Sequence, residues 1–140
     1  MTEATAPVAD RAWPQIVAAA RACIGTRFRA QGRVPGLALD CVGLVLAAGG
    51  IQPAVVPAYA LGGDHRHLLD ETLNAAGCRT VSSPLPGDIL VLEPAPRLRH
   101  LAIMTPSGAV HAHAGIGRVV EGPLYPGWSQ LAAWRFAGAR

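Results

Sequence analysis

The sequence predicts an α+β domain in which helices near the N-terminus cover one face of an antiparallel sheet of about five strands. Apolar residues recur at helical spacing in the first half of the chain, whereas the second half holds short β-prone runs separated by Gly and Pro. Helices followed by strands is the element order of an α+β domain. The 140 residues suffice for one core, so we expect a single domain at residues 10–140 behind a flexible arm at residues 1–9.

The first predicted helix has Pro14 in its first turn and Gly25 at its end. Its apolar residues at helical spacing are Trp13, Ile16, Val17, Ala20 and Ile24. Another helix follows later, where Asp64 can cap the N-terminus and Gly77 can end the helix. Both patterns are amphipathic, so each helix is expected to bury one side against the sheet.

The segments between these helices and the strands are irregular in this prediction. Residues 26–39 lose the apolar period and contain Gly32, Pro35 and Gly36, so we expect a loop there, and residues 52–63 are expected to form an irregular crossing. Asp88 follows Pro-Gly and is expected to be a turn residue at a strand entry rather than a catalytic acid. The five strands are predicted at residues 88–92, 100–104, 109–112, 118–121 and 132–136.

Composition excludes several classes of function. The net charge of +3 comes from arginine alone, and aromatic residues make up 5% of the chain, so neither a basic stripe nor a stacking platform for nucleic acid is expected. No apolar run reaches the roughly 18 residues of a membrane span, and the first ten residues have no basic region. We therefore expect no signal peptide, no membrane anchor, and synthesis in the cytoplasm.

Cys41 is the candidate nucleophile. Asp40 can cap a second helix that is apolar on nearly every side and ends at Gly49-Gly50, which places Cys41 in the first turn. The positive end of a helix dipole stabilises a thiolate, so we expect a lowered Cys41 pKa. The alternative is that Cys41 is a small buried apolar residue. With Cys23 and Cys78 the cysteines are odd in number and lack CxxC spacing, which indicates neither a disulfide framework nor structural zinc.

Three histidines on one predicted hairpin are candidates for the base that a catalytic cysteine needs. If the turn has two or four residues, His100 and His113 are opposite each other and His111 projects to the same side. Register alone therefore leaves open which of His111 and His113 supports His100. The pair His111 and His113, like His65 and His67, has metal-ligand spacing, but no carboxylate or cysteine recurs nearby, so we expect no metal and no cofactor.

Arg27, Arg29 and Arg33 precede Cys41 in the predicted loop. Such arginines are most often solvated, but at this place they can line a cleft for a ligand that carries a carboxylate.

Most of the chain resembles the NlpC/P60 family of cysteine peptidases, which have a papain-like fold and cleave stem peptides of the bacterial cell wall. Five segments carry the resemblance. The family's approach segment is matched by residues 24–32 and its nucleophile motif by residues 40–45. Its first sheet strand is matched by residues 86–90, its base strand by residues 100–103 and the strand of its third polar residue by residues 110–112. The ending, residues 119–136, is most similar to the phage-tail and gene-transfer-agent branch.

The resemblance implies a role for each site residue. Cys41 attacks the peptide carbonyl, His100 transfers the proton and His111 orients His100, because Val110-His111-Ala112 matches the family's apolar-His-Ala signature. The substrate-binding residues implied are Phe28, Arg29, Gln31, Asp40 and His113. The bond implied is that between D-glutamate and diaminopimelate or lysine, and no metal is implied.

The resemblance also implies where the protein acts and with what. Its partners would be peptidoglycan stem peptides and tail proteins of a phage or gene-transfer agent, and it would act in the cell wall or periplasm as part of a virion-like particle. Two alternatives stay open. One is a weak or inactive tail structural protein of the same fold, favoured because Arg27-Phe28 stand where the family usually has Pro-Tyr. The other is a thiol amidase or acyltransferase with another substrate.

Overall fold

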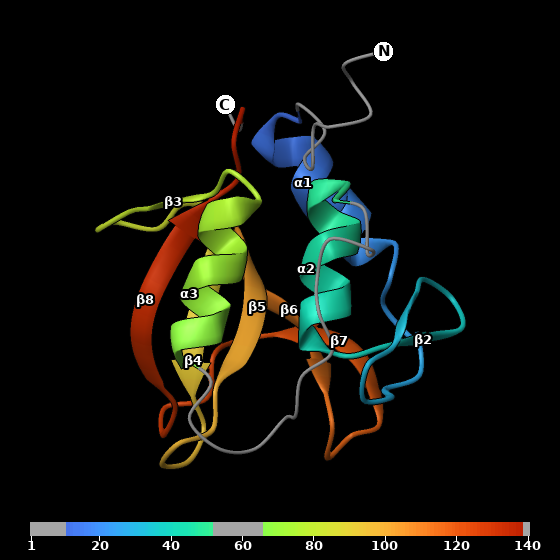
Figure 1. Cartoon of the computed structure of the whole chain (residues 1–140). Helices are drawn as coiled ribbons and strands as arrows, with labels where there is room; N and C mark the ends of the chain where they lie inside the picture. The colour runs from blue at the N-terminus through green and yellow to red at the C-terminus, as the bar shows by residue number, and fades with distance from the viewer. Residues whose placement is uncertain (1–10, 52–65, 139–140) are drawn as a thin grey trace.

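The computed structural model describes residues 11–51 and 66–138, which form three helices, a six-stranded antiparallel sheet and a separate two-stranded hairpin. The helices lie together on one side of the large sheet (Figure 1). The helices are α1 (Trp13–Arg21), α2 (Cys41–Gly49) and α3 (Arg66–Ala75). The strands are β1 (Arg33–Val34), β2 (Ala38–Leu39), β3 (Arg79–Thr80), β4 (Ile89–Glu93), β5 (His100–Thr105), β6 (Gly108–His113), β7 (Arg118–Gly122) and β8 (Ser129–Arg135).

The large sheet has the strand order β3-β8-β4-β5-β6-β7. The five predicted strands are all present, but the prediction of about five strands missed β3, a two-residue edge strand that pairs with β8. Strands β5 and β6 are joined by a two-residue turn that pairs Thr105 with Gly108 and Ile103 with Val110. This is one of the even-length turns for which all three histidines were expected on one side.

The alternation of side chains divides the sheet into two faces. The face under the helices carries the larger apolar residues, which join the main core with α1 and α2. These sheet residues include Ile89, Val91, Leu101, Ile103, Val110, Ala112 and Trp134. The opposite face carries a smaller cluster whose buried members are Leu90, Leu92, Ala102, Ala109 and Ala133. Most of the apolar burial therefore lies between the helices and the sheet.

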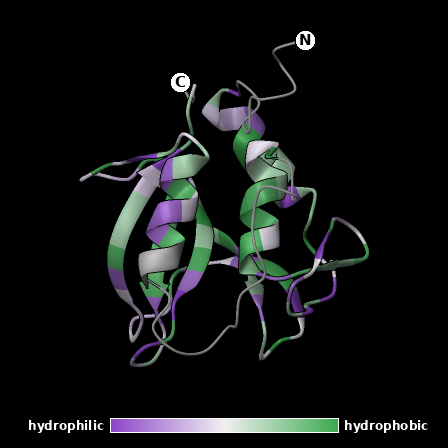
Figure 2. Cartoon of the chain, viewed as in Figure 1, coloured by the Kyte–Doolittle hydropathy of each residue, from purple (hydrophilic) through white to green (hydrophobic). Residues whose placement is uncertain are grey.

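Helix α2 is the most deeply buried helix, and it starts and ends as predicted. Figure 2 shows it as hydrophobic along nearly its whole length. The Asp40 side chain accepts a hydrogen bond from the Gly43 N–H at 2.9 Å, and Gly50 ends the helix with a left-handed φ of 69°. Since the cap fixes the first turn, the position of Cys41 follows from the sequence of this helix.

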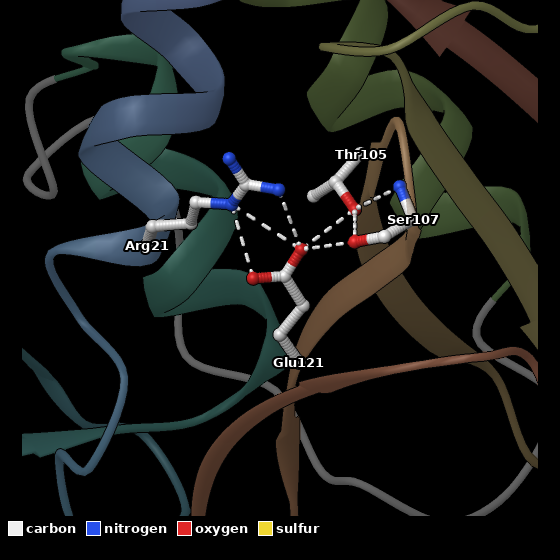
Figure 3. A network of polar contacts seen from close by, with 4 residues as sticks. All are labelled: Arg21, Thr105, Ser107 and Glu121. Carbon is white, nitrogen blue, oxygen red and sulfur yellow. Dashed lines mark hydrogen bonds and ion pairs between the residues drawn. The ribbon is translucent and has the colours of Figure 1, made fainter.

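Helix α1 is shorter than predicted. It ends at Arg21, and Ile24, which fits the helical spacing, is 47% exposed in the turn that follows. The Arg21 guanidinium binds the Glu121 carboxylate of β7, with Nη2 to Oε2 at 2.9 Å (Figure 3). Thr105 and Ser107 also donate to Glu121, at 2.8 and 3.0 Å. Arg21 and these hydroxyls hold the pKa of Glu121 below its usual value. Through Glu121 the network connects α1 to the β5–β6 turn.

Two smaller predictions concern the loops. Residues 26–39 are not wholly irregular, because β1 and β2 form a short hairpin with Gly36 in a left-handed conformation at the turn. Asp88 is the turn residue predicted, since its carboxylate accepts the Leu85 N–H at 2.8 Å. Asp88 also binds Arg135 through two hydrogen bonds of 2.8 and 2.7 Å, which connects β4 to β8.

Three expectations fall on residues that the structure does not describe. They are the arm at residues 1–9, the crossing at residues 52–63 and the Asp64 cap of α3. The end of α3 is as expected, because Gly77 has a φ of 88°. Among the described residues, no helix has the length and apolar character needed to cross a membrane.

Gly43 allows α2 to lie directly against the preceding loop. A Cβ at this position would overlap the backbone carbonyl oxygen of Gly32. We therefore expect Gly43→Ala to lower the free energy of unfolding by about 1–3 kcal/mol, the usual cost of overpacking, as measured by urea denaturation.

The matched control is Gly127→Ala, where a Cβ meets nothing within 4 Å. This variant should stay within about 0.5 kcal/mol of the parent. Equal stability of the two variants would contradict the close packing of α2 against Gly32.

Candidate active site

The Asp40 carboxylate fixes the start of α2 and the loop beside it. Asp40 has no exposed surface. Its Oδ1 accepts from the Gly43 N–H and from Arg33 Nη1, both at 2.9 Å, and its Oδ2 accepts from the Gln31 N–H at 2.8 Å. A buried carboxylate destabilises a fold unless it is hydrogen-bonded, and here its donors come from both sides of the Cys41 position in the sequence. Asp40 therefore organises the site, and its carboxylate does not face a space that a substrate can enter.

Cys41 lies in the first turn of α2 and is 6% exposed. The backbone N–H of Leu101 on β5, the residue that follows His100, acts to stabilise its thiolate form. Burial raises the pKa of the thiol to about 11, although the N–H groups of Leu101 and Val42 act to lower it. The expectation of a lowered Cys41 pKa is wrong, because removal of the thiolate from water outweighs the stabilisation by the helix N-terminus.

His100 and His111 form a direct pair. Nε2 of His100 lies 2.9 Å from Nδ1 of His111, and the two rings meet edge to face with centroids 5.0 Å apart. Both side chains lie on the sheet face of the smaller apolar cluster, because His100 precedes Ala102 by two residues and His111 follows Ala109 by two. The contact expected between these two imidazoles is present, and His111 reaches His100 diagonally across the strand pair.

His113 does not take part in that contact. Its Nδ1 accepts the backbone N–H of Ile116 at 3.1 Å, and its ring is 5.4 Å from that of His111. His113 is partly exposed, whereas His111 is 4% exposed. The arrangement expected, with His111 deeper in the sheet and His113 nearer the solvent, is the one observed.

Burial keeps both paired imidazoles neutral near pH 7. It lowers the pKa of His100 to about 3, with further lowering from the positive charge that His111 and His113 can carry. Burial likewise lowers the pKa of His111 to about 4, again with a contribution from His113. One ring therefore donates and the other accepts in the 2.9 Å hydrogen bond. If Nε2 of His100 is the donor, Nδ1 of His100 is left without a proton and can act as a base.

The thiol and His100 are not hydrogen-bonded to each other. The backbone N–H that stabilises the Cys41 thiolate belongs to Leu101, the residue after His100, and among the described residues no hydrogen bond joins the sulfur to the His100 ring. Because Nε2 of His100 is already paired with His111, Nδ1 is the nitrogen available to the thiol. Hydrogen bonds between catalytic groups are often long before substrate binds.

Tyr125 and Trp128 complete the histidine cluster and were not among the predicted site residues. The Trp128 ring meets His100 and His111 at centroid distances of 5.2 and 5.6 Å, and the Tyr125 ring is 5.7 Å from that of His113. Both aromatics come from the connection between β7 and β8. Two aromatic residues flanking the turn residues Pro126-Gly127 were the available signal, since solvated turns rarely need them.

The remaining predicted substrate-binding residues are divided between core and surface. Phe28 packs against the main core, and its N–H donates to the Gly117 carbonyl at 2.8 Å. Gln31 is exposed, with a left-handed φ of 65° that lets its N–H reach Asp40. Arg29 is also exposed, whereas Arg33 is held by Asp40 at 2.9 Å. The structure thus leaves Arg29, Gln31 and His113 at positions that a ligand can approach.

The other cysteines lie in the core. Cys23 and Cys78 are 3% and 4% exposed, and the Cys23 thiol donates to the Ala19 carbonyl at 3.5 Å. Burial raises the pKa of both thiols, that of Cys78 to about 11. Within residues 11–51 and 66–138, no three His, Cys, Asp or Glu side chains are placed to hold a metal ion.

Comparison with known proteins identifies the fold. The sequence matches no family model and no curated protein. Two solved structures are similar in fold: NlpC1 from Trichomonas vaginalis, 18% identical with a TM-score of 0.63 over 89% of this chain and 44% of its own, and NlpC2 from the same organism, 15% identical with a TM-score of 0.62 over 94% and 50%. The chain spans about half the length of either protein. The NlpC-like fold, with helices on an antiparallel sheet, is the one predicted.

The paired imidazoles make stability depend on pH. Their pKa values in the folded state lie below the ordinary value of 6.5, so below pH 6.5 the unfolded chain binds more protons than the folded one. We expect the free energy of unfolding, measured by urea denaturation at a series of pH values, to fall as the pH decreases from 6.5 towards about 4.

The double variant His100→Gln and His111→Gln removes both groups and should flatten this part of the profile, whatever its absolute stability. Cys41→Ala keeps both imidazoles and should retain the parent slope. If the double variant and the parent have the same slope between pH 6.5 and 4, the two histidines are not buried as neutral groups.

Proposed function

We propose that this chain is a cysteine peptidase that hydrolyses peptide bonds in the stem peptides of bacterial peptidoglycan. The observation that carries the proposal is the 2.9 Å contact between His100 Nε2 and His111 Nδ1, next to Leu101, whose backbone N–H acts to lower the pKa of the Cys41 thiol. A thiol, a base and a group that orients the base are what nucleophilic cysteine catalysis requires. The NlpC-like fold supports the choice of a wall peptide as substrate.

In the proposed reaction, the Cys41 thiol gives its proton to His100 Nδ1 while the sulfur attacks the peptide carbonyl carbon. The Cys41 N–H stabilises the resulting oxyanion, and the C–N bond then breaks as His100 returns the proton to the amine. Water hydrolyses the thioester, with His100 again taking and returning a proton, and the free thiol is restored. Throughout, His111 accepts the His100 Nε2–H and so keeps Nδ1 directed at the sulfur.

The raised pKa of Cys41 and the lowered pKa of His100 influence the first step. A thiolate and an imidazolium are both disfavoured before substrate binds, so proton transfer accompanies the attack instead of preceding it. Trp128 and Tyr125 shield the imidazoles from water on the side away from α2. Shielding strengthens the hydrogen bond between the two histidines.

The substrate and setting within this proposal come from the resemblance. The bond is that between D-glutamate and diaminopimelate or lysine, and the protein acts in the wall or periplasm as a component of a phage tail or gene-transfer agent. Of the predicted substrate-binding residues, we retain Arg29, Gln31 and His113, which are at least partly exposed, and assign Asp40 and Phe28 to supporting the site.

A second candidate is a non-catalytic tail protein of the same fold. Three observations favour it: the thiol is 6% exposed, it is not hydrogen-bonded to His100, and Phe28 supplies no hydroxyl. Under this candidate the histidine pair is a structural element of the sheet.

Digestion of purified peptidoglycan, followed by mass spectrometry of the fragments, tests the proposal. The parent should release stem-peptide fragments cut after D-glutamate. Cys41→Ala should abolish release, and His100→Ala should slow it by about 10²–10⁴-fold, the usual contribution of a general base. His111→Ala should also slow release, because the His100 ring then loses the partner that orients it.

The control is Cys78→Ala, which removes a buried thiol outside the site and should keep the parent rate if the variant is folded. Circular dichroism establishes folding for each variant. No fragments from the parent, with all variants folded, would favour the non-catalytic candidate. Fragments cut at another bond would correct the substrate assignment and leave the mechanism in place.

A further inference from the structure

A hollow of about 650 Å³ lies on the loop that leads to Cys41. Its lining residues are Gly25, Arg27, Arg29, Gly36, Leu37 and Ala38. The volume falls in the range of small-molecule sites, about 300–1,000 Å³. None of Cys41, His100 and His111 lines it, so the hollow is separate from the proposed catalytic groups.

The backbone that carries Arg27 and Arg29 is fixed. Phe28 lies between them with its side chain in the core, so the two arginines project together away from the core. Arg29 N–H donates to the Leu39 carbonyl at 3.1 Å, and Leu39 N–H donates to the Arg27 carbonyl at 2.9 Å. The two guanidinium groups therefore start from rigid positions on one side of the loop, which reduces the entropy lost when they bind a ligand.

The charge of this hollow is not compensated by the described part of the chain. Arg27 and Arg29 are exposed, and no ion pair joins either of them to a carboxylate among the described residues, in contrast to Arg33, which binds Asp40. Arg27 also pairs across the backbone with Arg118, another exposed arginine. Like charges directly opposite each other are unfavourable, and an anion between them removes that repulsion.

The chemistry of the lining indicates a carboxylate on a short peptide. A guanidinium matches a carboxylate through two parallel hydrogen bonds. The rest of the wall is aliphatic or glycine, with Leu37 69% exposed, so it offers contact to methyl and methylene groups and few other polar side chains. A peptide carboxylate flanked by aliphatic atoms satisfies both parts of the lining.

The distance to Cys41 suits the same ligand. Ala38 is three residues before Cys41, so their Cα atoms are at most about 11 Å apart at 3.8 Å per residue. An extended peptide covers about 3.3–3.6 Å per residue, so about three residues of peptide span this distance. We propose that Arg27 and Arg29 bind a free carboxylate of the peptide substrate at this hollow. This proposal rests on the proposed peptidase function for the identity of the peptide.

Binding without turnover tests the proposal. The probe is the synthetic peptide alanyl-γ-D-glutamyl-lysine with free carboxylates, titrated calorimetrically into the full chain carrying Cys41→Ala. Adding Arg27→Gln and Arg29→Gln should weaken binding by about tenfold or more, as expected for the loss of a charge-assisted hydrogen bond. The same peptide with its carboxylates amidated should bind weakly to both proteins.

Two further variants make the result specific. Arg79→Gln neutralises an exposed arginine on the distant edge strand β3 and should leave binding unchanged. Arg27→Lys with Arg29→Lys keeps the charge but not the planar fork, and should bind with intermediate strength. Three outcomes would each overturn the proposal. The Cys41→Ala protein could bind the free and amidated peptides equally, it could bind no better than the protein with the added glutamine substitutions, or it could fail to bind the peptide.

The outcome is separable from that of the peptidase proposal. If peptidoglycan is not cleaved but binding depends on Arg27 and Arg29, the hollow is a carboxylate site on a non-catalytic protein. If peptidoglycan is cleaved and the glutamine variant has an unchanged KM, the hollow is not part of substrate recognition.

Discussion

The buried carboxylate of Asp40 is the interaction on which the arrangement of the site depends. It accepts hydrogen bonds from Gly43, Gln31 and Arg33, so one group holds the first turn of α2 and the loop before it. The loop lies directly against α2, because a Cβ at Gly43 would overlap the backbone carbonyl oxygen of Gly32. Removing one hydrogen-bond partner of a buried charged group lowers the free energy of unfolding by more than the intact pair contributes to it. Through these contacts Asp40 sets both the place of Cys41 and the orientation of the arginine-bearing loop.

The same burial that fixes the geometry also determines the protonation of the site. A helix N-terminus stabilises a nearby anion by about 0.3–1 kcal/mol, and up to about 2 kcal/mol where partly buried, whereas complete burial of a charged group shifts a pKa by as much as 3–5 units. Burial is the larger effect at Cys41, whose pKa rises to about 11, and at His100, whose pKa falls to about 3. The resting site therefore holds a neutral thiol and a neutral imidazole pair. Substrate must therefore supply part of the stabilisation that makes proton transfer favourable.

Local patterns predicted much of this structure. The cap at Asp40, the end of α2 at Gly50 and the hairpin register that sets the histidines on one face are consequences of short-range chemistry. Features that depend on distant neighbours were missed or wrong. The Cys41 pKa depends on how much of the sheet covers α2, and Trp128 reaches His100 from a loop 28 positions later. Strand β3 has two residues, too short for any alternation to be read from the sequence.

The pH dependence of Cys41 alkylation is the most direct test of a neutral resting site. The rate of carboxamidomethylation by iodoacetamide, followed at Cys41 by peptide mapping, reports the fraction of thiolate. A thiol with a pKa of about 11 should react at a rate that rises about tenfold per pH unit from pH 6 to 9, without a plateau. A rate that is already constant between pH 6 and 9 would show a preformed thiolate paired with an imidazolium, and would contradict the account.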